Sequence, residues 1–310
     1  MPRKRTRKVR RPLLAILSRK RSLYSTRRLV EAARARGMRT RVLDVLACNL
    51  VLERGQPRLF VGGEELRDVA VAVPRIGASV TAAGLAVVRQ LEAQGVPVVN
   101  GTEGIANSRD KLRALQLLAE AGVDMPRTVL ARGGGDIKEL LTHVGGLPAI
   151  LKLIQGTQGV SVMIAHSEAE VDSILSTLWD LGHEILLQEF VAESRGRDVR
   201  ALVVGDRVVG AMRREARSGE FRSNLHRGGE GTAVELPPHY AQAAVRAAQV
   251  LSLAVAGVDL LEAQGGPKVM EVNSSPGFEG LERATGLDIA GAIVEYAASL
   301  AARPRRAVGS

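Results

Sequence analysis

The stretch GVDLLEAQGGPKVMEVNSSPG, residues 257–277, holds two apolar runs separated by a glycine-rich turn, a pattern typical of a β-hairpin. If the chain folds back about Gly265, Asp259 lies directly opposite Glu271, and Asn273 projects from the same face because side chains alternate along a strand. Two facing carboxylates repel each other unless a cation lies between them, and oxygen ligands of this kind suit Mg²⁺ shared with phosphates. The hairpin therefore predicts a metal site at Asp259, Glu271 and Asn273, with an exposed, solvated face as the alternative.

The other face of the hairpin is predicted to point into a core, because its side chains are apolar: Val258, Leu260, Met270 and Val272. A second antiparallel pair is expected where residues 201–204 and 207–211 flank a Gly205-Asp206 turn. Between residues 13 and 99, by contrast, short apolar runs alternate with amphipathic stretches, which is typical of an α/β domain with a largely parallel sheet. We therefore expect an α/β domain that ends near residue 105, followed by two α+β lobes.

Lys152 interrupts an apolar strand predicted at residues 147–154, where an uncompensated ammonium group would be costly to bury. The glycine-rich stretch QGTQGVS, residues 155–161, follows directly. Backbone N–H groups of such a turn can approach an anion while the ammonium group neutralises it, so this segment is a candidate phosphate clamp. The alternative is a lysine at a strand edge beside an ordinary hairpin.

Two further segments carry groups that could bind anions. Ser108 is expected to cap a helix at residues 109–121, which places Lys111 in the first turn, where a cation opposes the helix dipole unless a phosphate is bound. The loop GEFRSNLHRGGEGT, residues 219–232, suits a mobile cover over a phosphate or carboxylate. Its candidate side chains are Arg222, Asn224, His226 and Arg227. Exposed surface positions are the alternative for both segments.

The excess of basic residues lies at the two ends of the chain. The 310 residues contain 43 Lys and Arg against 33 Asp and Glu, a net charge of +10. Residues 1–12 hold seven of the basic residues and residues 303–310 hold three, with no acid in either stretch, so residues 13–302 are neutral overall. This balance, together with an aromatic content of 3%, argues against a nucleic-acid-binding surface over the body of the protein.

The single cysteine, Cys48, excludes an internal disulfide and a site built from several thiolates. No apolar run approaches the roughly 18 residues that a membrane helix needs, and the start of the chain lacks the core of a signal peptide. We therefore expect a cytoplasmic protein with no membrane partner.

In this order along the chain, the segments resemble the ATP-grasp superfamily, and most closely its RimK-type glutamate ligases. The matching segments are ILSR (16–19), LYS (23–25), PRIG (74–77), RDKLRALQLLAEAG (109–122), KLIQGTQGVSV (152–162), QEF (188–190), FRSNLHRGG (221–229), VAGVDLLEA (255–263) and MEVNSSPG (270–277). The resemblance implies a Rossmann-like pre-grasp domain followed by two α+β lobes that enclose ATP. The expected segments are a disordered basic arm at 1–12, the pre-grasp domain at 13–105, the lobes at 106–190 and 191–302, and a basic tail at 303–310.

The resemblance also implies roles for individual residues. Asp259, Glu271 and Asn273 match positions that hold two Mg²⁺ or Mn²⁺ ions, and Lys152 and Arg222 match catalytic positions. ATP would be bound by Lys111, Lys152, Gly156, Gln158, Gly159, Gln188, Glu189, Phe190, Val191, Asp198, Arg222, Ser223 and Asn224. Substrates would be contacted by Arg75, Arg214, His226 and Arg227.

The implied reaction joins L-glutamate to a carboxylate through an acyl phosphate, with ATP converted to ADP and phosphate. The implied acceptor is the C-terminus of a small-subunit ribosomal protein, or a growing poly-α-glutamate chain. Ligation to a cofactor or to an amino-acid carrier protein is the alternative, and a non-catalytic RNA- or ribosome-binding protein on the same fold is a different class of function. The family further implies a homo-oligomer, a tetramer. The basic ends would be solvated and disordered, or would make weak contacts with RNA.

Overall fold

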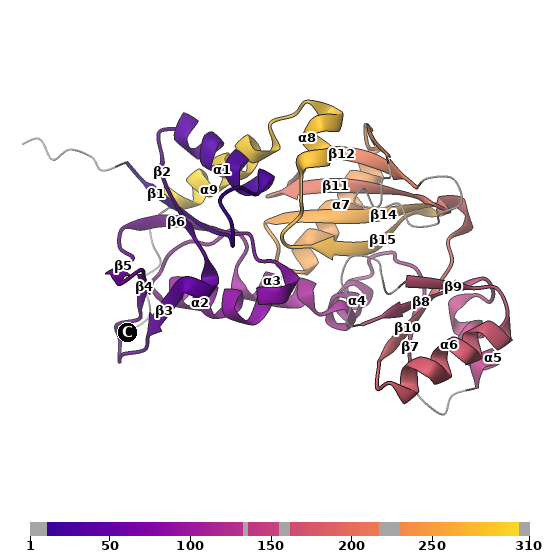
Figure 1. The fold of residues 1–310 in the computed structure, drawn as a ribbon. Coiled ribbons are helices and arrows are strands. Elements are labelled where there is room, and N and C mark those ends of the chain that lie inside the picture. Colours follow the sequence, from indigo (N-terminus) through magenta and orange to yellow (C-terminus); the bar gives the residue numbers. More distant parts are fainter. Residues whose placement is uncertain (1–10, 133–135, 155–161, 217–229, 304–310) are drawn as a thin grey trace, which may run out of the picture. The chain divides into compact units, whose positions relative to one another are not determined.

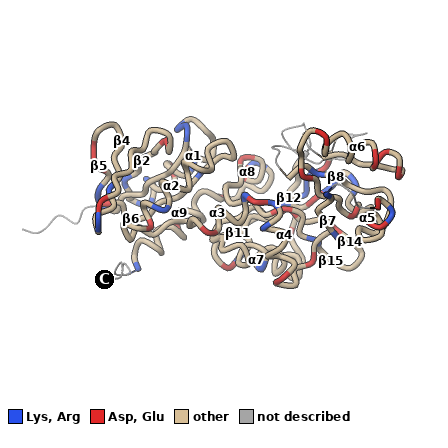
Figure 2. The backbone as a smooth tube through the Cα atoms, turned by 90° about the horizontal axis from the view of Figure 1, so that it is seen from below, with Lys and Arg blue, Asp and Glu red and all other residues tan. Residues whose placement is uncertain are grey.

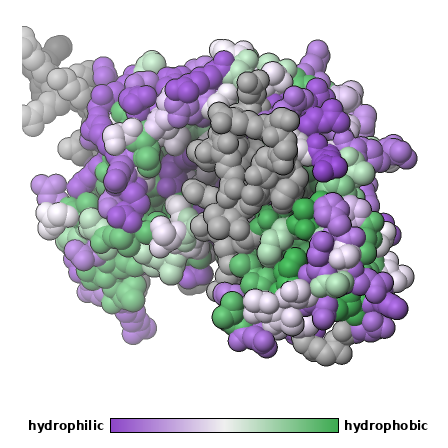
Figure 3. Space-filling view, turned by 45° about the vertical axis from the view of Figure 1, so that its right-hand side comes forward, coloured by the Kyte–Doolittle hydropathy of each residue, from purple (hydrophilic) through white to green (hydrophobic). Residues whose placement is uncertain are grey.

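The computed structural model describes residues 11–132, 136–154, 162–216 and 230–303. The chain divides into two compact units, one formed by Met1–Thr102 with Asp288–Ser310 and the other by Glu103–Leu287 (Figure 1). Over the described ranges, no helix combines the length and the apolar character needed to cross a membrane. The face shown in Figure 3 carries both hydrophilic and hydrophobic side chains, and the hydrophobic ones gather in patches.

A parallel three-stranded sheet forms the centre of the first unit, as the alternating pattern predicted. Its order is β2 (Arg39–Leu43), β1 (Leu13–Leu17) and β6 (Val69–Pro74), and both neighbours run parallel to β1. All five residues of β1 are buried, as expected for a central strand that is covered on both faces. Helices α1 (Tyr24–Ala35) and α2 (Thr81–Ala93) follow β1 and β6 in the chain, and the short helix η2 (Ala78–Val80) precedes α2.

The C-terminal helix α9 (Ile289–Ala301) returns to this first unit, whereas the expected second lobe extends over residues 191–302. It packs on α1 and β6 through a nearly continuous apolar surface. At its start, the Asp288 carboxylate accepts a hydrogen bond from the backbone of Gly291 and lies 2.9 Å from Arg28 Nη2 on α1. The last helix therefore completes the first unit.

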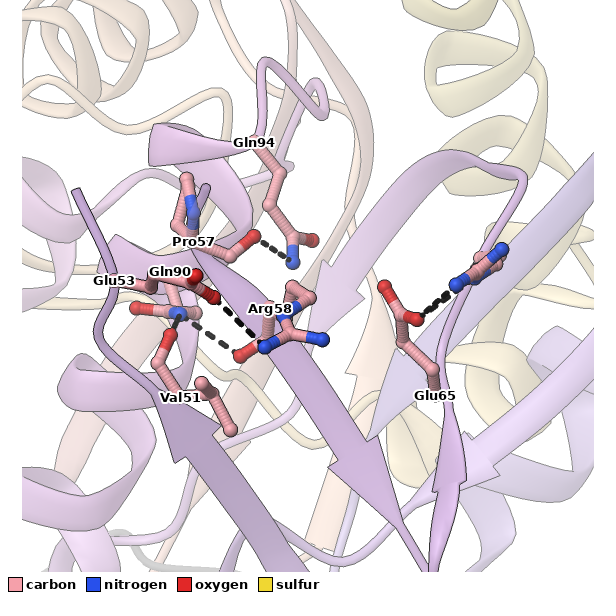
Figure 4. A network of polar contacts seen from close by, with 8 residues as sticks. Val51, Glu53, Pro57, Arg58, Glu65, Gln90 and Gln94 are labelled. Atoms are coloured by element: carbon pink, nitrogen blue, oxygen red, sulfur yellow. Dashed lines mark hydrogen bonds and ion pairs between the residues drawn. The ribbon is translucent and has the colours of Figure 1, made fainter. Parts of the chain in front are cut away.

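A small antiparallel sheet, β3 (Cys48–Val51), β4 (Arg58–Val61) and β5 (Glu64–Glu65), follows the short helix η1 (Val45–Ala47) and is fastened to α2 (Figure 4). Gln90 is only 5% exposed, and its Nε2 donates to the carbonyls of Val51, at 3.1 Å, and Arg58, at 2.9 Å. Gln94 Nε2 donates to the carbonyl of Pro57 at 2.9 Å. A buried amide that is satisfied in this way holds the hairpin in one position on the helix.

The second unit begins with α3 (Thr102–Arg109) and α4 (Lys111–Glu120), and the predicted cap at Ser108 was wrong. Ser108 lies inside α3 and its hydroxyl donates to the carbonyl of Ile105, whereas Asp110 caps α4 by accepting from Arg113 N at 2.9 Å. An aspartate is as good a cap as a serine, so composition alone did not decide whether Ser108 or Asp110 precedes the helix. Lys111 still falls at the start of a helix, as predicted.

The next part of the second unit is a four-stranded antiparallel sheet covered by two helices. Its order is β7 (Thr128–Ala131), β10 (Ile185–Glu189), β8 (Ala149–Leu153) and β9 (Val162–Ala165). Helices α5 (Ile137–Val144) and α6 (Glu168–Asp180) bury their apolar faces in the same core as these strands. Asp136 and Ser167 cap the two helices.

A five-stranded antiparallel sheet completes the second unit. Its order is β13 (Glu230–Ala233), β12 (Arg207–Glu215), β11 (Arg197–Val204), β14 (Val255–Ala263) and β15 (Gly266–Asn273). The short helix η3 (Ala192–Ser194) precedes β11, α7 (Pro238–Val250) packs on the sheet, and α8 (Glu279–Thr285) contacts β12 and β13. The pairs predicted at 201–204 with 207–211 and at 258–262 with 268–273 are both present.

The hairpin of β14 and β15 pairs Asp259 with Glu271 as predicted, but its turn and its register near the turn differ from the prediction. The turn lies at Gln264 and Gly265, which shifts the register near the turn by one residue, and a bulge at Met270 restores it, so that Asp259 pairs with Glu271. The prediction that Met270 faces the core was wrong, because the bulge puts the fully buried Val269 beside Leu260 in that core while Met270 is only partly buried.

Candidate active site

Charged residues form a row across the five-stranded sheet. Arg200 on β11 pairs in register with Asp259 on β14, which in turn pairs with Glu271 on β15. On the other side of β11, Asp198 pairs in register with Arg214 of β12. Because side chains two residues apart on a strand share a face, Asp198 and Arg200 project from the same side of the sheet. One face of the sheet therefore carries two arginines among three acids, and two of these acids, Asp259 and Glu271, are direct neighbours.

The buried part of this row is held by forked ion pairs. Arg200 Nε lies 2.7 Å from Asp259 Oδ1, and Arg200 Nη2 lies 2.6 Å from Asp259 Oδ2. Arg214 binds Asp198 in the same way, with Nε 2.6 Å from Oδ1 and Nη2 2.6 Å from Oδ2. Arg214 Nη2 also lies 2.9 Å from Asp259 Oδ2. Asp198, Arg214 and Asp259 are each 2% exposed. Bidentate pairs of this type combine strength with a fixed geometry, so Arg214 ties the two aspartates together.

These neighbours keep Asp259 ionised. Burial acts to raise the pKa of its carboxyl, but the charges and hydrogen bonds of Arg200 and Arg214 outweigh burial and lower the pKa to about 2. The pKa of Arg214 is raised correspondingly, because Asp259 and Asp198 outweigh the effect of its own burial. Asp259 therefore offers carboxylate oxygens at any physiological pH.

The three predicted metal ligands lie at the end of this row. Glu271 is exposed opposite Asp259, and Asn273 is two residues further along the same strand, where its Oδ1 accepts from Ser275 N at 2.9 Å. Within the described part of the chain, no group of three or more His, Cys, Asp or Glu residues is placed to hold a metal ion. Two carboxylates and one amide nevertheless supply the oxygen donors that Mg²⁺ prefers, although both oxygens of Asp259 are already hydrogen-bonded to arginines.

Two lysines from the other part of the second unit act on the same carboxylates. Lys152 lies on β8, where its Nζ is 2.5 Å from Gln188 Oε1, and Lys111 Nζ donates to the carbonyl of Leu153 at 3.0 Å. Burial lowers the pKa of Lys152 to about 8, Glu271 and Asp259 act to raise it, and Lys111 acts to lower it. Burial also lowers the pKa of Lys111, and Glu271 again acts to raise it. The charge of Glu271, a predicted metal ligand, therefore acts on both lysines that are predicted to bind phosphate.

The segment predicted to hold adenine joins the two sheets of the second unit. Gln188 is 4% exposed, and its Nε2 donates to Thr128 Oγ1 at 2.8 Å while its Oε1 accepts from Lys152. The Glu189 carboxylate lies 2.8 and 2.9 Å from Lys268 Nζ of β15. Burial acts to raise the pKa of Glu189, but hydrogen bonds from Lys268 and Arg127 outweigh it and lower the pKa. Both side chains are therefore fixed in place.

The remaining predicted residues are dispersed. Phe190 is partly buried and Val191 is buried, both directly after β10. Arg75 belongs to the first unit, where it follows β6 and its backbone N–H donates to the carbonyl of Leu17 at 2.7 Å. Several predicted residues lie outside the described part of the chain: Gly156, Gln158, Gly159, Arg222, Ser223, Asn224, His226 and Arg227.

Sequence reasoning missed Arg200 and assigned Arg214 only to substrate contact. The sequence did contain a signal for Arg200. Arg200 and Asp198 are two residues apart within the largely apolar segment 197–204, and a charged side chain in such a strand requires a partner. Its partner was not evident, because the neighbour of this strand is β14, some sixty residues later in the chain.

Two domain families match this chain. The RimK PreATP-grasp domain matches residues 13–105, and the RimK-like ATP-grasp domain matches residues 108–297. A probable alpha-L-glutamate ligase of Rhodopirellula baltica is 53% identical over 283 residues, covering 91% of this chain and 70% of the relative. A probable alpha-L-glutamate ligase of Chromohalobacter salexigens is 49% identical over 294 residues, covering 95% and 97%.

Solved structures share the fold at lower sequence identity. The ATP-grasp ligase PsnB, complexed with minimal precursor, Mg and ADP, has a TM-score of 0.73 at 22% identity and covers 94% of this chain and 98% of its own. A RimK domain ATP-grasp protein from Sphaerobacter thermophilus has a TM-score of 0.68 at 24% identity, with coverage of 92% and 98%. The chain therefore contains the PreATP-grasp domain and the ATP-grasp domain of the RimK-like family. It belongs to that family and is an ATP-dependent ligase.

Proposed function

We propose that this enzyme is an α-L-glutamate ligase that activates a carboxylate as an acyl phosphate and joins it to the amine of glutamate. The observation that carries the proposal is that Lys111 bonds to β8 beside Lys152, and that the charge of Glu271 acts to raise the pKa of both lysines. The names of relatives at about half sequence identity supply the amino acid, since they are probable alpha-L-glutamate ligases.

The lysines and carboxylates have separate tasks in this reaction. Lys152 exchanges its hydrogen bond to Gln188 for a phosphate oxygen of ATP, and the added negative charge favours the charged ammonium. Lys111 neutralises a second phosphate oxygen. Asp259, Glu271 and Asn273 would hold Mg²⁺, or Mn²⁺, and two ions per site are expected. When bound, the metal screens the phosphate charge that repels the incoming carboxylate.

The reaction then proceeds in two steps that need no covalent bond to the enzyme. A carboxylate oxygen of the acceptor attacks the γ-phosphorus, the bond to the bridging oxygen breaks, and ADP leaves. The amine of glutamate attacks the acyl carbon, phosphate leaves, and a proton is released. Arg200 and Arg214 hold Asp259 ionised and oriented throughout, because each donates to its carboxylate.

The acceptor we favour is an acidic polypeptide, either the C-terminus of a small-subunit ribosomal protein or a poly-α-glutamate chain. A cofactor or an amino-acid carrier protein is the alternative. Peptide acceptors are supported by the neighbour PsnB, which was solved with a precursor peptide. A non-catalytic RNA-binding role is disfavoured by membership in a ligase family. The cytoplasmic location, the homo-oligomer and the contact of the basic ends with RNA stay predictions.

Transfer of ¹⁸O tests the proposed chemistry. An acidic acceptor peptide labelled with ¹⁸O at its carboxyl groups is incubated with ATP, Mg²⁺ and glutamate, and the released phosphate is analysed by mass spectrometry. Activation through an acyl phosphate transfers one ¹⁸O atom to each phosphate, because the carboxylate oxygen that bonds to phosphorus leaves with the phosphate when the amine attacks the acyl carbon and the carbon–oxygen bond breaks. Unlabelled phosphate released together with amide product would contradict the mechanism.

A further inference from the structure

A shallow, open pocket of about 350 Å³ lies in the first unit, at the end of β1 and along β2. Its lining contains three arginines, Arg19, Arg21 and Arg41, together with Ser18, Thr40 and Asp44. The backbone N–H of Ser18 donates to the carbonyl of Leu43 at 2.8 Å, which fixes the loop after β1 against the end of β2. Figure 2 marks basic positions at α1 and around β2 in this unit.

The positive charge of the pocket exceeds its negative charge. Asp44 supplies the acid in the lining, and its carboxylate lies 3.1 Å from Arg19 Nε and accepts from Leu46 N at 3.1 Å. Arg41 Nη2 is 3.8 Å from Glu64 Oε2, but the Glu64 side chain is 82% exposed, and a long pair in solvent compensates little charge. The charges of Arg21 and Arg41 therefore remain to attract an anion.

The helix that follows the pocket loop adds to this field. Leu23 occupies the position before α1 and makes no side-chain hydrogen bond to the helix, and the first turn contains no acid. The partial positive charge at the start of a helix is then not neutralised by its own side chains. The loop itself is fixed, because the hydroxyls of Ser18 and Thr26 are hydrogen-bonded at 2.7 Å in a buried position.

The chemistry of the pocket fits a carboxylate better than a nucleic acid. A guanidinium group presents a planar fork that matches the two oxygens of a carboxylate. RNA-binding surfaces use an extended row of cations and aromatic rings for stacking. This lining has three arginines in one small pocket, an aspartate among them and no aromatic ring.

We propose that the pocket lined by Arg19, Arg21 and Arg41 binds a carboxylate of the acidic peptide that the enzyme extends. The inference rests on the proposed function, since a glutamate ligase that acts on peptides makes a chain in which every added residue brings another carboxylate. Arg21 and Arg41 contact the carboxylate, and Arg19 is oriented by Asp44 at the edge of the pocket. The pocket thereby selects acidic acceptors over neutral ones.

Peptide binding by the full chain tests this proposal. The probe is tetraglutamate with a fluorescent label at its amino end, and binding is followed by anisotropy without nucleotide, so that no catalysis is required. We expect Arg21→Gln and Arg41→Gln each to weaken binding about tenfold, as the loss of one charge-assisted hydrogen bond does. The matched control is Arg54→Gln, an exposed arginine of the same unit outside the pocket lining, which leaves the affinity unchanged.

Two further probes identify the ligand class. Labelled tetraglutamine is expected to bind weakly to all four proteins, and polyuridylate is expected to displace tetraglutamate from none of them. Equal tetraglutamate affinity in wild type, Arg21→Gln and Arg41→Gln would overturn the proposal, and so would competition by polyuridylate that is lost in the two variants. Release of ADP by the wild type with glutamate is measured separately, so failure of the ligase function is distinguished from failure of the pocket.

Discussion

Replacing Lys152 with methionine should stabilise the protein in the absence of ATP while removing its activity. The ammonium group lies on β8 in a partly buried position, and burial lowers its pKa from 10.5 to about 8 despite the opposing effect of Glu271. A shift of this size favours the neutral amine by at most about 3 kcal/mol. Lys152 is therefore a costly residue to keep charged until a phosphate binds.

The pH dependence of this cost has a definite sign. The folded state favours the neutral amine, so the penalty is present in full below the folded pKa of about 8 and disappears as the pH rises toward the ordinary value of 10.5. Methionine has no charge at any pH, but it leaves Gln188 Oε1 without its lysine donor, which costs about 1 kcal/mol. The net gain is then about 2 kcal/mol at pH 7 and vanishes near pH 10.

Urea unfolding at pH 7 and pH 10 measures this difference. Trp179 is the single tryptophan of the chain, and it lies in α6, partly buried against the core of the sheet that contains β8, so its fluorescence reports on this part of the second unit. Lys138→Met is the matched control, because Lys138 is exposed on α5. A Lys152→Met protein that is less stable than wild type at pH 7, or equally stabilised at both pH values, would refute the reasoning.

Three other predictions follow from the same contacts. Binding of ATP near pH 8 should take up protons, because phosphate favours the ammonium form of Lys152; calorimetry in buffers of different ionisation enthalpy measures the uptake, and Lys152→Met should lose it. Glu271→Gln should lower ADP release at least about 100-fold, as loss of a metal ligand does, whereas the exposed Glu235→Gln should not; near-normal turnover would argue against the metal assignment. Arg214→Met leaves Asp198 and Asp259 without this buried partner and should cost about 3 kcal/mol in urea unfolding; an unchanged midpoint would contradict the role given to Arg214.

The facing pair Asp259 and Glu271 could be predicted from the sequence, because alternation in two apolar runs places charged residues on one face. The bulge at Met270 could not, since the position of an extra residue depends on how both strands pack on the core. The turn and the bulge have opposite effects on register, so the predicted pair is correct although the register next to the turn differs by one residue from the predicted one.

Contacts between distant segments were the other limit of prediction. The partners of Arg200 and Arg214 follow from the order of strands in the sheet, and the placement of α9 in the first unit follows from the return of the chain after residue 287. Neither follows from local periodicity. Lys111 and Lys152 could be identified as unusual from sequence alone, because each carries a charge where its local structure disfavours one.

The proposed function depends on the joining of glutamate to an acidic polypeptide at the expense of ATP. Mass spectrometry of an acidic acceptor peptide after incubation with ATP, Mg²⁺ and glutamate tests it most directly, with ADP measured in the same sample. We expect products that differ by whole glutamyl residues, one ADP for each residue added, and no product when ATP or glutamate is omitted. ADP release without any glutamyl product on the peptide would contradict it.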